Sequence, residues 1–224
     1  SHVSSHDLKE PVRKFRTFIN RLKDEYGSQL PAKGQNYLDK MELASERMSS
    51  MIVGVLKYSG LNETEQDIAT VDLNEVIRHI ETDLEVIIHQ KNAVITSDDL
   101  PVLEGASVLL YQLFYNLINN SLKFCDTQPI VNISASIVNL TGKEYARIKV
   151  ADNGIGFDQA FEDRIFEAFT RLNSKDKYEG TGLGLALCKK IVERHQGMIS
   201  ASGEENKGAM FTIHLPLVQT EKRV

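Results

Sequence analysis

The sequence lacks an apolar run long enough to cross a lipid bilayer, and no signal peptide is visible at its start. Cysteine is scarce: only Cys125 and Cys188 occur among the 224 residues, and their separation does not match a metal site. We therefore expect two reduced thiols in the core of a cytoplasmic protein. The formal net charge of −5 argues against a nucleic-acid surface. These absences leave a soluble globular chain of one large or two ordinary domains, with no membrane contact in this part.

Residues 1–62 are predicted to be almost entirely helical, because apolar side chains recur at intervals of three and four residues. The segment 27–34 interrupts this pattern and divides it into two stripes. The stripes consist of Leu8, Val12, Phe15, Ile19, Leu22 and Tyr26, and of Leu38, Met41, Met48, Ile52, Val55 and Leu56. Two antiparallel helices cannot bury both stripes alone, so we expect two hairpins to pair as a dimeric four-helix bundle. The polar segment 61–66 is the expected boundary to a second domain at 67–219.

Residues 67–219 mix helical and strand patterns, which indicates an α+β fold. Asp72 is a predicted helix N-cap. Strict alternation places Val131, Ile133, Ala135 and Ile137 on one face of a predicted strand. The predicted helices span 73–90, 104–124 and 183–196, and the predicted strands span 130–138, 145–152, 198–203 and 210–217.

His6 lies in the first predicted helix but not on its apolar side. A helix advances about 100° per residue, so the apolar stripe falls on the side opposite to His6. The histidine is therefore expected to be exposed, either without a role or as a nucleophile. Pro11 removes a helical hydrogen bond to the carbonyl of Asp7 and kinks the helix. Asp7 is placed to orient the imidazole and accept its proton, which a nucleophilic imidazole requires.

The stretch ADNGIGF ends a predicted strand with Asp152. An ionised carboxylate only accepts hydrogen bonds, so it favours the exocyclic amine of adenine over the carbonyl of guanine. Gly154 and Gly156 let the backbone approach a ligand closely. The alternative interpretation is a simple Asn-Gly turn.

The stretch EGTGLGLALC places Gly180, Gly182 and Gly184 just before a predicted helix. Amides at a helix N-terminus bind phosphate. The stretch is not a P-loop, because it lacks the Gly-Lys-Ser/Thr sequence. It is not a dinucleotide fingerprint either, because Leu187 stands where a small third residue would fall. A flexible linker is the alternative, and the helical run that starts at Leu183 argues against it.

The stretch NLINNSLKF supplies Asn116, Asn120 and Lys123 on one helix. Asn116 and Asn120 are four residues apart and share a helix face. An amide oxygen suits Mg²⁺, which accompanies nucleoside triphosphates, and a lysine can reach phosphate. A solvated polar helix face is the alternative.

Together these stretches resemble sensor histidine kinases over nearly the whole chain. NLINNSLKF resembles their N box, DNGIGF their first glycine box, IFEAFTRL their phenylalanine box and GTGLGLAL their second glycine box. HDLKEP resembles the start of their dimerisation and histidine-phosphotransfer hairpin. The resemblance implies a dimeric hairpin at 1–62 and a GHKL-type ATP-binding domain at 67–219, an α/β sandwich with a mixed sheet covered by helices.

The resemblance also implies a protein histidine kinase that uses ATP and Mg²⁺, autophosphorylates His6 and passes the phosphate to an aspartate of a response-regulator receiver domain. Asn120 would coordinate Mg²⁺ and Asp152 would bind adenine, while Phe166 and Phe169 would anchor one end of a mobile lid over 170–179. The implied catalytic residues are His6, Asp7, Asn116, Lys123 and Arg171. The implied nucleotide-binding residues are Asn116, Asn120, Lys123, Asp152, Gly154, Gly156, Phe169, Gly180, Thr181, Gly182, Leu183 and Gly184.

Three positions depart from the family pattern. Ser121 and Ala168 replace a common alanine and a common proline. Glu10 replaces the Thr or Asn of members that also dephosphorylate their partner, so we expect weak phosphatase activity.

Two rival functions remain open. One is an ATP-hydrolysing enzyme of the same fold, disfavoured because Asn116 stands where such enzymes place a glutamate base. The other is a catalytically silent dimeric scaffold. His6 lies near the start of the chain, so we expect a sensory region to precede it in its parent, whether or not that parent is membrane-attached. Cis or trans autophosphorylation depends on the handedness of the connection 27–34, which the sequence leaves open.

Overall fold

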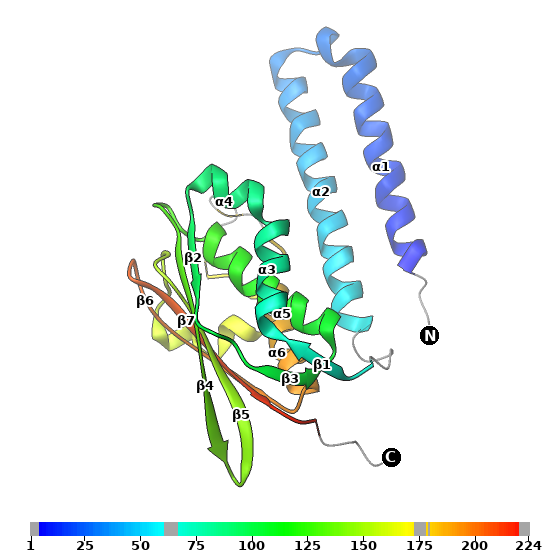
Figure 1. Cartoon of the computed structure of the whole chain (residues 1–224). Helices are drawn as coiled ribbons and strands as arrows, with labels where there is room; N and C mark the ends of the chain where they lie inside the picture. The colour runs from blue at the N-terminus through cyan, green and yellow to red at the C-terminus, as the bar shows by residue number, and fades with distance from the viewer. Residues whose placement is uncertain (1–4, 61–66, 173–177, 179, 220–224) are drawn as a thin grey trace. The chain divides into compact units, whose positions relative to one another are not determined.

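The computed structural model describes residues 5–60, 67–172, 178 and 180–219, and it leaves undescribed the side chains of helical residues 5–8, 47, 50 and 57–60. The described residues form two compact units. One is a helical hairpin and the other is an α+β unit, as Figure 1 shows. This architecture confirms the predicted fold class.

The hairpin consists of two helices joined by a short turn. Helix α1 spans Ser5–Tyr26, the 3-10 turn η1 spans Gly27–Gln29, and helix α2 spans Ala32–Gly60. Lys23 joins the two helices through ion pairs with Asp39 at 2.9 Å and Glu42 at 2.6 Å. None of the helices in the described part of the chain is both long and apolar enough to cross a membrane.

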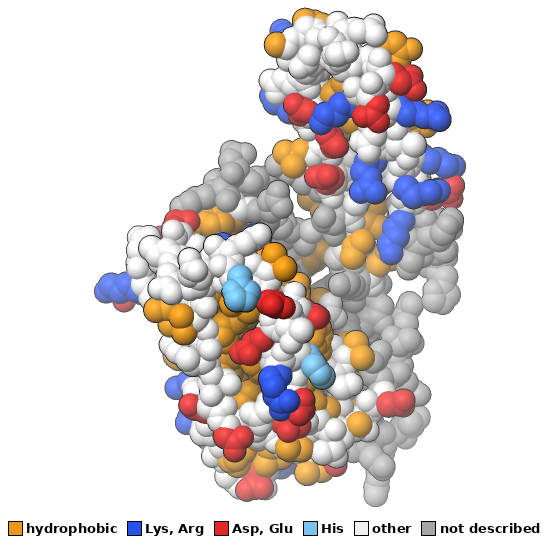
Figure 2. All heavy atoms as spheres, turned by 45° about the horizontal axis from the view of Figure 1, so that its top comes forward, with side chains coloured by type: hydrophobic (Ala, Val, Ile, Leu, Met, Phe, Trp, Pro, Cys, Tyr) orange, Lys and Arg blue, Asp and Glu red, His pale blue; other side chains and the backbone are white. Residues whose placement is uncertain are grey.

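The predicted apolar stripes are only partly buried within one hairpin. Ile19 and Leu38 are buried against the facing helix. Phe15, Leu22 and Tyr26 of α1, in contrast, remain between 44% and 50% exposed. Figure 2 shows hydrophobic side chains lying among charged ones on the surface of the hairpin. A single hairpin therefore leaves much of its apolar surface in contact with water.

The α+β unit contains a mixed sheet of five strands in the order β2-β4-β5-β7-β6 and a ribbon of β1 and β3. Strand β2 is parallel to β4, and the other pairs in this sheet are antiparallel. The strands are β1 (Ala69–Asp72), β2 (Val94–Ser97), β3 (Val102–Gly105), β4 (Ile130–Leu140), β5 (Lys143–Asp152), β6 (Met198–Glu204) and β7 (Gly208–Pro216). The helical elements are α3 (Leu73–Asp83), α4 (Glu85–Lys91), α5 (Ser107–Lys123), η2 (Gln159–Phe161), η3 (Arg164–Phe166) and α6 (Gly184–Arg194).

Helices α5 and α6 pack on one face of the sheet and α3 packs on α5, as Figure 1 shows. The buried side chains of the strands alternate, as a sheet covered on one face requires. The core-facing residues of β4, β5 and β7 include Val131, Ile133, Ala146, Ile148, Val150, Phe211, Ile213 and Leu215. This layer holds α5 near the end of β5, which pairs with the start of β7, and the candidate site lies there.

Three sequence expectations differ from the structure. The helix predicted over 73–90 is broken at Leu84, which is buried and has φ −97° and ψ 5°. The predicted common face of Val131, Ile133, Ala135 and Ile137 is not buried along its whole length, since Ile137 is 49% exposed. Strands β1, β2 and β3 were not predicted, since each has only four residues.

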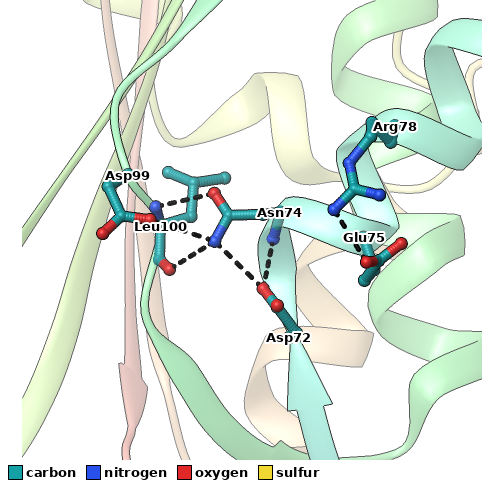
Figure 3. A network of polar contacts seen from close by, with 6 residues as sticks. All are labelled: Asp72, Asn74, Glu75, Arg78, Asp99 and Leu100. Atoms are coloured by element: carbon teal, nitrogen blue, oxygen red, sulfur yellow. Dashed lines mark hydrogen bonds and ion pairs between the residues drawn. The ribbon is translucent and has the colours of Figure 1, made fainter.

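Asn74 fastens the start of α3 to the loop between β2 and β3 (Figure 3). Its side-chain oxygen accepts from Leu100 N at 2.9 Å, and its nitrogen donates to Leu100 O at 2.9 Å. The same nitrogen lies 3.0 Å from Asp72 Oδ1 and 3.3 Å from Asp99 Oδ1. Asp72 also accepts from Asn74 N at 2.8 Å, which confirms the predicted N-cap. Both polar atoms of the Asn74 side chain are therefore hydrogen-bonded within the protein.

His195 is a buried structural histidine at the end of α6. Its Nε2 accepts a hydrogen bond from Ala106 N at 3.0 Å, which requires the proton to be on Nδ1. Nδ1 then donates to Ile191 O at 2.8 Å. Burial lowers the pKa of His195, because the charged form would lose its hydration. The neutral ring thus ties the start of α5 to the end of α6.

Candidate functional site

Asp152 is held by hydrogen-bond donors from three parts of the α+β unit. Its Oδ1 accepts from Gly154 N at 2.9 Å and from Ala209 N at 3.2 Å. Its Oδ2 accepts from Ser121 Oγ at 3.0 Å. The carboxylate is half-buried, and each carboxylate oxygen can accept two hydrogen bonds. Oδ2 therefore keeps acceptor capacity for a ligand, while Oδ1 has two donors already.

The glycines around Asp152 lie where other backbone segments approach closely. A Cβ on Gly154 would lie 2.5 Å from Phe124 O. Gly156 has φ +62°, and its Cβ would lie 1.9 Å from Glu204 O. A Cβ on Gly208 would lie 1.9 Å from Asp152 O. The structure thus requires glycine in the first glycine box because other backbone segments of the chain lie close to it, and the close approach to a ligand stays a prediction.

Helices α5 and α6 approach each other at Asn120 and Gly184. The side-chain nitrogen of Asn120 lies 4.0 Å from the point that a Cβ on Gly184 would occupy. Gly184 is the first residue of α6, and its N-cap Leu183 makes no side-chain capping bond. An amide side chain therefore stands beside a helix N-terminus, a position that favours an anion.

These residues fit Mg²⁺ bound together with a phosphate ligand. The Asn120 oxygen is a hard donor, and the α6 N-terminus suits the negative charge that accompanies the ion. Among the residues that the structure describes, no group of three His, Cys, Asp or Glu could hold a metal alone. Mg²⁺ would therefore depend on Asn120, ligand oxygens and water.

Asn116 lies deeper between α5 and α6 than the sequence suggests. Its Nδ2 is buried and meets no acceptor with hydrogen-bonding geometry among the described residues. The amide lies beside Cys188, whose pKa burial raises to about 12 and the amide partly lowers. A proximity of Asn116 to phosphates stays a prediction.

The end of α5 meets Tyr178 of the predicted lid. The rings of Phe124 and Tyr178 are 5.0 Å apart, and the Tyr178 hydroxyl donates to Asp126 Oδ1 at 2.7 Å. The Lys123 ammonium lies 4.7 Å from the centre of the Phe124 ring. Arg171 donates to the backbone oxygen of Tyr178. The sequence did not indicate Tyr178 or Asp126, and a contact of Arg171 with phosphate stays a prediction.

The phenylalanine box joins the second glycine box through the backbone. Phe169 N donates to Gly182 O at 3.0 Å, and a Cβ on Gly182 would lie 2.8 Å from the carbonyl carbon of Phe169. Phe166 is buried and meets Phe211 edge-on at 6.4 Å, whereas Phe169 is 59% exposed. Gly180 is exposed and Thr181 is half-buried. Of the predicted lid, residues 173–177 and 179 lie outside the described residues.

His6 and Asp7 lie in the first turn of α1, as predicted. Their side chains lie outside the described residues, so the predicted exposure of His6 stays a prediction. They belong to the hairpin, whereas the other predicted site residues, apart from Gly180 and Thr181, belong to the α+β unit.

The family follows from a match over the region just described. Residues 105–219 match the family model of the histidine kinase-, DNA gyrase B-, and HSP90-like ATPases. The chain belongs to this ATPase family. The match contains Asn120, Asp152 and both glycine boxes, so the predicted family resemblance is confirmed.

The relatives of this ATPase family member include sensor kinases. The chain is 34% identical to cyanobacterial phytochrome A of Nostoc sp. over 99% of its own length and 29% of that protein. It is 28% identical to the sensor histidine kinase RcsC of Escherichia coli over 95% of its length and 22% of that protein. The chain therefore spans less than a third of either relative.

Two solved structures share the fold of both units. One is full-length ShkA in complex with AMPPNP, with a TM-score of 0.70 and 25% identity over 98% of this chain and 46% of that one. The other is histidine kinase ThkA in complex with the response regulator TrrA, with a TM-score of 0.65 and 21% identity over 93% of this chain and 59% of that one. The ATPase family's fold and hairpin thus recur together in solved proteins.

Proposed function

We propose that this chain is the catalytic core of an ATP-dependent protein histidine kinase that phosphorylates its own His6. The main support for the proposal is that a site for adenine and a site for phosphate occur in the same ATPase-family unit. Asp152 presents a carboxylate oxygen suited to the adenine amine, and Asn120 stands beside the N-terminus of α6, suited to phosphate. The domain bounds proposed are 1–62 for the phosphotransfer hairpin and 67–219 for ATP binding.

The reaction uses positioning and charge neutralisation. Asp152 Oδ2 accepts from the adenine amine, and the α6 backbone with Lys123 holds phosphate oxygens. Mg²⁺, when bound with Asn120, supplies further positive charge. One ring nitrogen of His6 forms the bond to the γ-phosphorus while the bond to the bridging oxygen breaks, and ADP leaves. Asp7 holds the proton on the other ring nitrogen.

Labelling with ATP tests the proposal. Incubation with Mg²⁺ and γ-labelled ATP should give a phosphoprotein that is labile in acid and stable in alkali. His6→Gln should abolish the label, whereas His89→Gln, which changes an exposed helical histidine, should retain it. Equal labelling of His6→Gln and the parent would refute His6 as the acceptor. Release of inorganic phosphate without any protein label would favour the hydrolytic ATPase instead.

A homodimer is part of the proposal, with the two hairpins forming a four-helix bundle. The exposed apolar residues of α1 and α2 support it, because a second hairpin would cover them. Light scattering should report twice the chain mass at micromolar concentration. Leu22→Glu should yield a monomer, and Asn20→Glu, a neighbouring exposed position, should not. A monomeric parent would contradict the proposed bundle.

The proposed phosphate acceptor is an aspartate of a response-regulator receiver domain. Helix α1 carries more basic than acidic residues: Lys9, Arg13, Lys14, Arg16, Arg21 and Lys23 against Asp7, Glu10, Asp24 and Glu25. Such a basic helix attracts an acidic partner surface, and the attraction weakens with salt. A protein of the same fold, ThkA, was solved with its response regulator. Transfer of label from His6 to a receiver, slowed by added salt, tests this step. A cytoplasmic location is proposed because ATP and receiver domains are available there.

A further inference from the structure

Ser121 is a buried polar residue on the apolar side of α5. It is 2% exposed, and its neighbours Leu117 and Leu122 are fully buried. Its sequence neighbour is Asn120, the residue expected to act at the phosphates. Burying a hydroxyl is unfavourable unless it is hydrogen-bonded, so the contacts of Ser121 Oγ define its role.

The hydroxyl has one proton and two acceptors within reach. Leu117 O lies 3.1 Å from Ser121 Oγ, and Asp152 Oδ2 lies 3.0 Å from it. If the proton pointed to Leu117, an oxygen lone pair would face the anionic Oδ2. A hydrogen bond to a charged acceptor is also stronger than one to a neutral carbonyl. The proton therefore belongs on the side of Asp152.

This bond acts on the oxygen that is available to a nucleobase. Oδ1 of Asp152 is occupied by Gly154 N and Ala209 N, both of them backbone donors. Oδ2 has Ser121 as its donor from the protein and retains a second lone pair. Ser121 thus fixes the rotation of the carboxylate from the side of α5, so that the second lone pair keeps one direction.

We propose that Ser121 is a positioning residue for base recognition, whose hydroxyl holds Asp152 Oδ2 in the orientation that accepts the 6-amino group of a purine. The inference rests on the proposed binding of ATP and adds its selectivity determinant. A purine with a 6-carbonyl has no such donor and would bring its oxygen towards the same carboxylate oxygen. The Ser121–Asp152 pair therefore favours 6-amino over 6-oxo purine nucleotides.

Nucleotide titrations of the full chain test the role of the hydroxyl. Ser121→Ala should raise the dissociation constant of Mg·ATP by about tenfold, because a carboxylate that is no longer held in place loses most of its bond to the purine amine, which contributes about 1.5–3 kcal/mol. The preference for ATP over inosine triphosphate should fall as well. Ser121→Cys still fills the site, with a slightly larger atom, but has a weak donor, so it should behave like Ser121→Ala. If Ser121→Cys restores parental affinity and selectivity, Ser121 acts through volume and the proposal is wrong.

A double-mutant cycle shows whether Ser121 acts through Asp152. In the Asp152→Asn background, Ser121→Ala should change ATP affinity by less than about twofold, because its target carboxylate is gone. Additive effects would overturn the proposal and leave Ser121 with a packing role only. Ser45→Ala, which removes another buried helical hydroxyl in the hairpin, should leave ATP binding at the parental level.

The outcomes also separate this proposal from the proposed function. A parent chain that binds no ATP would contradict the kinase. A parent that binds ATP, together with a Ser121→Ala variant of equal affinity and selectivity, would overturn the role of Ser121 alone. At saturating Mg·ATP the rate of His6 labelling should remain at the parental value in Ser121→Ala, because the hydroxyl contacts the base-binding carboxylate rather than the phosphate groups.

Discussion

Replacing Asp152 with asparagine changes the charge and the hydrogen-bonding character of one atom without changing the side-chain shape. In the folded protein Gly154 N and Ala209 N both donate to Oδ1. An asparagine must keep its carbonyl oxygen at that place, because its NH₂ group would otherwise face two N–H donors. The NH₂ group therefore takes the position of Oδ2 and presents a donor to the adenine amine, which is also a donor.

The loss of ATP affinity follows from this reversed polarity. A hydrogen bond to a charged group contributes about 1.5–3 kcal/mol, which corresponds to an increase of roughly 10- to 150-fold in the dissociation constant. The two backbone bonds to the side-chain oxygen persist, so the free energy of unfolding should change by about 1 kcal/mol or less. Asp152→Asn should therefore lose the nucleotide without losing the fold.

Calorimetric titration of Mg·ATP into the parent and Asp152→Asn measures this effect, with thermal unfolding run in parallel. Asp158→Asn is the matched control, because Asp158 also accepts a backbone N–H, from Ala160 at 2.9 Å, but caps the exposed turn η2. Its ATP affinity should equal that of the parent. An unchanged affinity in a folded Asp152→Asn variant would remove Asp152 from the base site and refute the argument from its oxygen atoms.

Two further predictions follow from the contacts of Asn74 and His195, and a third from the negative charge of Glu10. Asn74→Ala should lower the free energy of unfolding by about 2–3 kcal/mol, because Leu100 N loses its partner, and chemical denaturation measures it. The parent should lose stability as the pH falls below about 6.5, because His195 becomes protonated on unfolding, and the loss is at most about 1.4 kcal/mol per pH unit. In denaturation curves measured at several pH values, His195→Gln should show a weaker pH dependence. Glu10→Thr should speed the loss of phosphate from a phosphorylated regulator, because a neutral hydroxyl can position water without repelling the phosphoryl group.

The sign of the pH effect follows from the buried ring. Burial lowers the pKa of folded His195, so between that pKa and about 6.5 the unfolded chain binds more protons than the folded one. The stabilisation is complete above the unfolded pKa and decreases as the pH falls. Equal pH dependence of the parent and His195→Gln would contradict this assignment.

Controls for the other two predictions are available in the same elements. Arg78→Ala breaks only an exposed pair with Glu75 and should change stability by less than about 0.5 kcal/mol. If Asn74→Ala changes the free energy of unfolding as little as Arg78→Ala does, the hydrogen bonds of Asn74 shown in Figure 3 do not stabilise the fold. The carboxylate of Glu10 pairs with Lys14 at 2.8 Å. Lys14→Ala removes this ion pair but keeps the negative charge of Glu10, so it is the control for Glu10→Thr. A rapid phosphatase reaction by the parent would show that the charge argument fails.

Sequence periodicity predicts the longer elements of this fold because each has a burial pattern of its own. Helix α1 repeats its apolar positions over 22 residues, and strand β5 repeats its buried positions over 10 residues. Strand β2 has only four residues, and none of them is fully buried, so no pattern can appear. The break at Leu84 is also invisible, because a buried leucine continues the apolar stripe of α3.

In the candidate site, features within one short segment could be predicted from the sequence, whereas contacts between distant segments could not. The glycine boxes are recognisable because several glycines stand together in one short segment, although the backbone atoms that they approach lie elsewhere in the chain. The donors to Asp152 are not, since Ser121 and Ala209 lie 31 and 57 residues away along the chain. Ser121 gives one weak signal, a polar residue between apolar positions of a helix, but its partner depends on how α5 packs against the sheet.

The glycine-lined surroundings of Asp152 bear on how the chain could escape an inhibitor. The groups that fix this carboxylate include the peptide nitrogens of Gly154 and Ala209, which every residue except proline retains. Gly156 and Gly208 leave no room for a Cβ, so side-chain replacement there disrupts the fold before it alters the pocket. A compound anchored on Asp152 would therefore meet a surface with few routes to resistance by point mutation. Position 121 is the exception, because its hydroxyl is a side-chain group that one substitution can remove.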